Sequence, residues 1–178
     1  MNLKIAAWAS IIAAIFYVPA FIVSFMMEFI PENQLLYIFT FIILGISLLT
    51  ALPLYLGYLK IAKLKKILFL RIMMHINIVS VILLNLFFAS TIQNYSQIIL
   101  ILTLIVTALT GALILVTGIA LLSLRSIFSG LITAISVLYI INGIFAMSLF
   151  MIILLPFTAT ATSILEAIFF FRASKKYD

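Results

Sequence analysis

The stretch from Ile72 to Leu124, IMMHINIVSVILLNLFFASTIQNYSQIILILTLIVTALTGALILVTGIALLSL, decides the fold. Its 53 residues include no Asp, Glu, Lys or Arg. A helix needs about 20 apolar residues to cross a hydrocarbon core of about 30 Å, so this stretch is too long for one crossing and right for two. The segment Thr91–Gln97, TIQNYSQ, is the most polar uncharged segment in the chain and predicts the turn between them.

Three further runs outside this stretch are nearly free of charge. Ile5–Met27 and Asn33–Leu59 each have the length of one crossing. Ile5–Met27 is also longer than the apolar core of a signal peptide, which has about 7–15 residues, so we expect it to be a retained span. Ser126–Phe171 holds one charged residue, Glu166, and is long enough for two. We therefore predict six spans, at about 5–27, 35–59, 70–90, 98–123, 127–147 and 150–171.

The turn inside Ser126–Phe171 has two candidate positions. Asn142-Gly143 is a favourable turn dipeptide. Met147-Ser148 divides the run into two helices of nearly equal length, and we favour it for that reason. A re-entrant segment here would leave five full spans instead of six.

The composition agrees with an all-α, polytopic transmembrane helical bundle. Of 178 residues, 67% are hydrophobic and 8% are charged, against about 25% charged in soluble domains. The runs are apolar on every face and are longer than the strands of a membrane β-barrel, which have about 10 residues of alternating polarity. We expect one domain, 1–178, without a soluble part, and the absence of cysteine excludes disulfides, thiolate metal sites and cysteine nucleophiles.

The basic residues provide an independent test of six spans. Six spans would place all ten on one side of the membrane, and an excess of Lys and Arg marks cytoplasmic loops. We therefore expect a multi-pass protein of the cell membrane with both termini in the cytoplasm. Glu28, Glu32 and the neutral turn Gln93–Gln97 would face the other side. The basic loop could also contact anionic lipid head groups, at about 1 kcal/mol per residue, through Lys60, Lys63, Lys65 and Lys66.

Small residues form stripes along the last three predicted spans. Membrane helices associate through close packing at such stripes, so we interpret them as packing seams rather than ligand sites. Proline inside a span removes a backbone hydrogen bond, and we expect kinks at Pro19, Pro53 and Pro156. The stripes comprise Thr103, Thr107, Gly111 and Gly118; Ser129, Thr133, Ser136 and Gly143; and Thr158–Ser163.

Ionisable and amide side chains within spans are the candidate functional residues, because they are costly in hydrocarbon. Glu166 is the one carboxylate within a predicted span, and two interpretations remain open. It either forms a proton or cation site, paired across helices with Arg71 or His75, or forms a structural ion pair near the interface. His75 more simply bonds to a neighbouring helix; haem ligation with a methionine is chemically feasible, but no attachment motif exists and we expect no cofactor. The candidate polar site comprises Arg71, His75, Asn77, Asn85 and Glu166.

Three functions compete on these residues. The first is a non-catalytic accessory or scaffold subunit that packs against other membrane proteins or a second copy, supported by small-residue seams and short loops. The second is a small transporter or channel for an ion, solute or lipid, using Glu166 with Arg71 and His75. The third, an intramembrane enzyme, lacks a nucleophile, metal set or nucleotide-binding motif. We rank them in this order and expect the lipid bilayer, but no nucleic acid or nucleotide, as a partner.

Overall fold

The computed structural model describes residues 2–29, 34–91, 97–148 and 151–178. Within these ranges the secondary structure is helical, without a strand. The side chains of Glu28 and Gln97, with Glu32 and the turn residues 92–96, lie outside what the structure describes. The elements are α1 Leu3–Phe29, α2 Gln34–Leu64, α3 Leu68–Thr91, α4 Gln97–Leu121, η1 Leu122–Leu124, α5 Arg125–Ser148, η2 Ile152–Leu154 and α6 Leu155–Tyr177.

Six helices among the described residues are long and apolar enough to cross a membrane, which confirms the predicted transmembrane bundle. The last turn is the one favoured from the sequence. α5 ends at Ser148, whose hydroxyl accepts a hydrogen bond from the Met151 N–H at 3.2 Å, and Asn142-Gly143 lies inside α5. Pro156 lies in the first turn of α6, where its missing N–H costs no helix hydrogen bond, so the kink predicted there is wrong.

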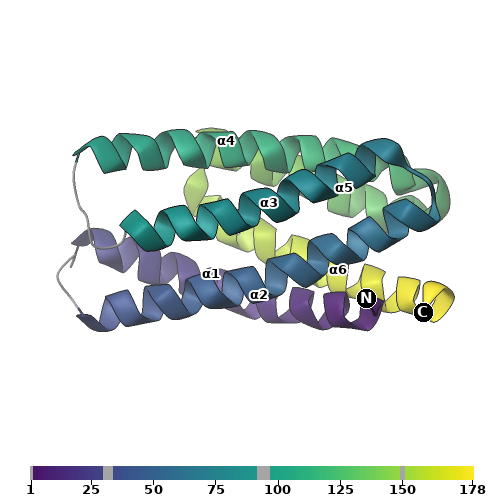
Figure 1. Ribbon diagram of the computed structural model, residues 1–178, viewed down its shortest axis with the longest axis horizontal. Coiled ribbons are helices and arrows are strands. Elements are labelled where there is room, and N and C mark those ends of the chain that lie inside the picture. The colour runs from purple at the N-terminus through teal and green to yellow at the C-terminus, as the bar shows by residue number, and fades with distance from the viewer. Residues whose placement is uncertain (1, 30–33, 92–96, 149–150) are drawn as a thin grey trace.

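The helices run alternately up and down, and neighbours in sequence are neighbours in space (Figure 1). α1 packs along α6 and closes the ring, while α3 and α4 make the weakest contact of any sequential pair. Both termini, the α2–α3 junction and the α4–α5 junction lie at one end, here called the basic end (Figure 1). All ten Lys and Arg residues belong to the segments at or next to this end.

The α2–α3 junction is a tight helix ending. The Ile67 N–H donates to the Ala62 carbonyl at 3.0 Å and the Lys66 N–H to the Lys63 carbonyl at 3.2 Å, the paired bonds of a Schellman cap. Lys66 has φ 55°, the left-handed conformation that usually requires glycine. Ile67 packs against the buried core, which fixes the entry of the chain into α3.

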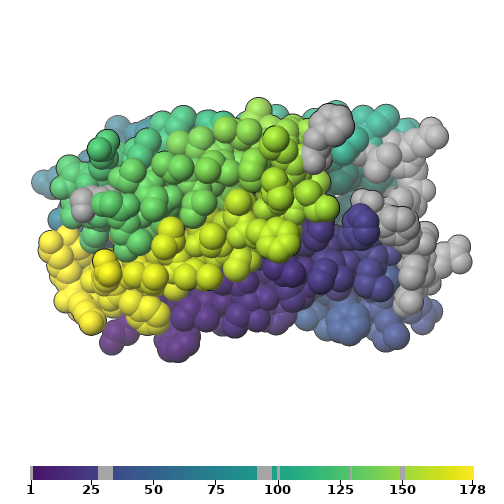
Figure 2. Space-filling model, turned by 180° about the vertical axis from the view of Figure 1, so that it is seen from behind, coloured from purple at the N-terminus to yellow at the C-terminus, as the bar shows by residue number. Residues whose placement is uncertain are grey.

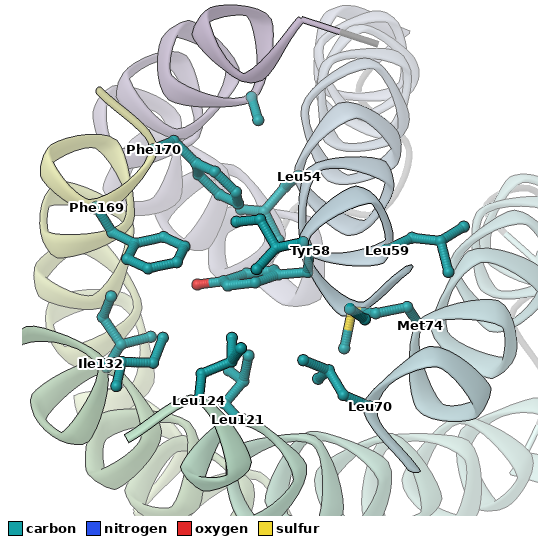
Figure 3. Close-up of a cluster of buried hydrophobic side chains, with 14 of the residues drawn as sticks. Leu54, Tyr58, Leu59, Leu70, Met74, Leu121, Leu124, Ile132, Phe169 and Phe170 are labelled. Carbon is teal, nitrogen blue, oxygen red and sulfur yellow. The ribbon is translucent and has the colours of Figure 1, made fainter. Parts of the chain in front are cut away.

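The core lies in the half of the bundle next to the basic end. The Tyr58 ring stacks on Phe169 at 5.7 Å between centroids and meets Phe170 at 4.8 Å. Figure 3 shows Tyr58 of α2 in the middle of the bundle, with both phenylalanines of α6 beside it and Leu121 and Leu124 below. α2 and α6 are thereby joined through one aromatic cluster, with residues of the α4–α5 junction packed beside it.

α4 and α5 pack more closely than side chains would normally allow. A Cβ at Gly143 would lie 2.6 Å from the Gly111 carbonyl oxygen, and one at Gly118 would lie 2.8 Å from the Ser136 carbonyl oxygen. These glycines belong to the small-residue stripes, so part of the predicted packing role is confirmed within the chain itself. Seen from the back of the molecule, α5, α6 and α1 lie side by side and form one continuous face (Figure 2).

The packing is unequal along the bundle. In α1, α2 and α3, most buried residues occur before Ala13, after Thr50 and before Asn77, which is the half next to the basic end. α5 and α6 have buried residues along most of their length. The half away from the basic end is therefore loosely filled between α1–α3 and α5–α6, and a cavity lies there.

Candidate functional site

The cavity has a volume of about 510 Å³ and receives residues from all six helices. Such a volume lies within the range of about 300–1,000 Å³ that holds small molecules in proteins. Its wall is largely apolar and aromatic, interrupted by hydroxyl and amide groups and one carboxyl. The polar and aromatic lining residues are Phe16, Tyr17, Ser24, Thr40, Ser47, Thr50, Tyr55, Asn85, Phe88, Thr91, Tyr139, Asn142, Thr162, Ser163 and Glu166.

Glu166 lies in the cavity wall on α6 and is 1% exposed. The Tyr139 hydroxyl of α5 donates a hydrogen bond to its Oε1 at 2.7 Å. The Tyr58 hydroxyl of α2 donates to the same oxygen at 3.1 Å. Three helices therefore meet at one carboxyl oxygen, and two neutral donors hold the group in place.

No described lysine, arginine or histidine forms an ion pair with Glu166. The ion pair found among the described residues joins Lys60 to Asp178, at the basic end. The interpretation of Glu166 as an interfacial ion pair is therefore wrong. α6 continues to Tyr177, about three turns beyond Glu166 and past the predicted end at residue 171, so this carboxyl lies farther from the helix end than the sequence suggested.

Two amide oxygens in the cavity wall have no hydrogen-bond partner among the described residues. Asn142 is 6% exposed; its Nδ2 donates to Thr162 Oγ1 at 3.0 Å, while its Oδ1 is unpartnered. Asn85 donates from Nδ2 to the Val81 carbonyl at 2.8 Å, and its Oδ1 is likewise unpartnered. Buried polar atoms are normally paired, so these two acceptors are unusual. Both can accept a hydrogen bond from a molecule in the cavity.

The remaining predicted site residues lie elsewhere. Arg71 and His75 are exposed on the outside of α3, and His75 Nδ1 lies 2.7 Å from the Arg71 carbonyl oxygen. Asn77 is buried but faces α4, where its Nδ2 donates to Thr117 Oγ1 at 2.8 Å. The proposed pairing of Glu166 with Arg71 or His75 is therefore absent, since those side chains belong to another face of the bundle.

At the basic end, Asp178 joins three helices. Its Oδ2 accepts the Leu3 N–H of α1 at 2.8 Å, and its Oδ1 accepts a hydrogen bond from Lys60 of α2. Burial alone would raise the pKa of Asp178, but these bonds outweigh it and hold the pKa below its usual value. Lys60 thus has a partner within the chain, while Lys65 lies over the Tyr177 ring at 4.8 Å. Lipid contact by Lys60, Lys63, Lys65 and Lys66 stays a prediction.

Sequence reasoning missed Tyr58 and Asn142 as site residues. Tyr58 resembles an interfacial tyrosine near basic residues, and Asn142 stands in a dipeptide typical of turns. One signal was available: Tyr17 and Tyr139 fall away from the span ends, where an interfacial belt would not place them, and both line the cavity. Comparison with known proteins finds no matching family model, curated protein or solved structure.

Proposed function

We propose that this protein is a small, non-catalytic membrane carrier that binds a solute in the central cavity, with Glu166 as its charged contact. The observation that carries the proposal is a fully buried carboxyl in the wall of a cavity of about 510 Å³, without a neutralising cation among the described residues. Ionisable groups inside membrane bundles mark solute and ion pathways. The tyrosine donors hold this group toward the solute.

The position of the cavity fits one state of a carrier. The Tyr58, Phe169 and Phe170 cluster fills the bundle between the cavity and the basic end. With the basic end in the cytoplasm of a cell, as the charge distribution favours, the closed side would face inward and the cavity would lie toward the outside. Solute would then pass when this cluster separates.

A scaffold function has less support than it had from the sequence. It relied on small-residue stripes that could serve partner proteins. Gly111, Gly118 and Gly143 instead meet residues of the α4–α5 pair inside the chain. These contacts use the stripes for internal packing, and the cavity is a feature that a scaffold does not need.

A thermal-shift screen of the purified protein tests the proposal. Ligands that bind only the folded state raise Tm, so we expect cationic amines and ammonium ions to raise it, while carboxylates and sulfonates do not. Glu166→Gln should lose this shift, because the amide keeps the size of the side chain but cannot carry the charge. Asp178→Asn, the matched control at the basic end, should keep it.

Either of two results would refute the carrier. The first is an absence of any Tm shift across a panel of cationic, neutral and anionic compounds. The second is an equal shift in wild type and Glu166→Gln, which would place binding outside the cavity. Uptake of an active compound into proteoliposomes then separates transport from binding alone, and a compound that binds without entering would leave a receptor rather than a carrier.

A further inference from the structure

The cavity has an unusual charge distribution. Among its described lining residues, Glu166 is the one with a formal charge, and no Lys, Arg or His is present. The groups that can titrate around it are the hydroxyls of Tyr17 on α1, Tyr55 and Tyr58 on α2, and Tyr139 on α5. The lining residues of α3 and α4 are uncharged. The cavity therefore has capacity for one positive charge.

An ionised carboxylate cannot remain buried and uncompensated without a large cost. Two occupants can remove that cost: a proton on the carboxyl, or a cation beside it. Both act at Glu166, whose Oε1 already accepts the two tyrosine hydrogen bonds. Because one carboxyl serves both occupants, they exclude each other.

The rest of the wall decides which cations fit. A hard metal ion takes about six oxygen ligands, while the described residues contain no cluster of three acidic or histidine side chains that could hold one. The wall instead presents the aromatic rings of Phe16, Tyr17, Tyr55, Phe88 and Tyr139. Aromatic faces attract organic cations. An amine would in addition find the free Oδ1 atoms of Asn85 and Asn142.

Resting on the proposed carrier function, we propose that the protein exchanges one organic monocation for one proton at Glu166. With the cavity open, the protonated carboxyl releases its proton to water and the carboxylate pairs with the cation. On the other side the cation leaves and a proton returns to the carboxyl. Each passage moves one positive charge in each direction, so the cycle is electroneutral.

Proton release on cation binding tests whether the proton and the cation exclude each other at Glu166. Tetraethylammonium and tetraphenylphosphonium, a small and a large organic monocation, are added to the purified protein in weak buffer with a pH-sensitive dye. We expect one proton released per cation bound, and a tenfold loss of apparent affinity for each pH unit on the acidic limb. Glu166→Gln should release none, whereas Asp178→Asn, which removes a carboxylate outside the cavity, should match wild type.

Transport tests the stoichiometry. In proteoliposomes an inward tetraethylammonium gradient should make the lumen alkaline, and clamping the membrane potential with K⁺ and valinomycin should leave the rate unchanged. Cation binding at Glu166 without proton release, or a rate that follows the potential, would overturn the exchange while leaving the carrier intact. Failure of both cations to bind at any pH, while neutral compounds bind at the cavity, would overturn the choice of a cation. Failure of every compound would overturn the carrier as well.

Discussion

The hydroxyl of Tyr139 lies 2.7 Å from Oε1 of Glu166, although the two residues belong to different helices and both are buried. Tyr58 reaches the same oxygen at 3.1 Å. The shorter bond joins neighbours in the bundle, α5 and α6, while the longer one crosses from α2. The shorter contact should accordingly be the stronger of the two.

Tyr139→Phe should destabilise the protein by about 1–3 kcal/mol, because it removes a donor from a buried acceptor. Tyr58→Phe should cost less, since its bond is longer. Reversible unfolding in mixed detergent micelles measures both. Tyr55→Phe is the control: its hydroxyl belongs to the cavity wall but makes no hydrogen bond within the described part of the chain. Equal stability of wild type and Tyr139→Phe would show that this bond contributes nothing.

Gly143→Ala should destabilise the α4–α5 pair by about 1–3 kcal/mol through overpacking. The new Cβ would lie 2.6 Å from the Gly111 carbonyl oxygen and 2.6 Å from the Leu115 nitrogen, and backbone atoms cannot move aside as side chains do. Gly45→Ala is the matched control in α2, because nothing lies within 4 Å of its added Cβ. The same unfolding assay should show a loss for Gly143→Ala only, and a loss of similar size in both variants would refute the close approach.

Lys66→Gly should stabilise the protein by about 0.5–1 kcal/mol. A side chain in the left-handed conformation costs about 1–2 kcal/mol, and part of the gain is lost to the greater freedom of glycine in the unfolded chain. Lys63→Gly, which lies within α2, should instead destabilise by about 1 kcal/mol. Opposite signs in thermal unfolding confirm the Schellman ending of α2, and a loss in both would contradict it.

Asp178→Asn should remove a pH-dependent part of the stability. The pKa of Asp178 is lower in the folded protein than the value of about 3.9 in an unfolded chain, so its stabilisation is present above that value and disappears as the pH falls through the folded pKa. Wild type should therefore exceed the variant in Tm from pH 7 to pH 5, and the difference should shrink as the pH falls below about 3.9 and vanish below the folded pKa.

The fluorescence of Trp8 provides a local measurement of the same contact. Trp8 is the single tryptophan and packs edge-on against Phe171 at 5.7 Å, which joins α1 to α6 about two helix turns before Asp178. We expect its emission to shift in Asp178→Asn at pH 7 and in wild type only after acidification. A variant that behaves as wild type at every pH would show that Asp178 does not hold the start of α1.

The spans could be predicted from the sequence because hydrocarbon thickness imposes a length on every crossing. The turn at Ser148 followed from that constraint alone. The site could not be predicted in the same way. Tyr58 and Glu166 are 108 residues apart, and their meeting depends on how α2 and α6 rotate about their own axes, which nearly uniform apolar sequences do not specify. Asn85 was predicted as a site residue from its polarity alone. The same criterion selected His75, which lies outside the cavity, because polar side chains near helix ends can also point away from the bundle.

Two features separate the helices into two groups. α4 and α5 approach each other closely around Gly111, Gly118 and Gly143, whereas α1, α2 and α3 each have most of their buried residues in the half of the bundle next to the basic end. The half of α1, a helix of 27 residues, that lies beyond the core is about 20 Å long. A tilt of about 10° would displace its end by about 3–4 Å. A small rearrangement of the packing around the Tyr58 ring would then move the ends of these helices that lie away from the basic end.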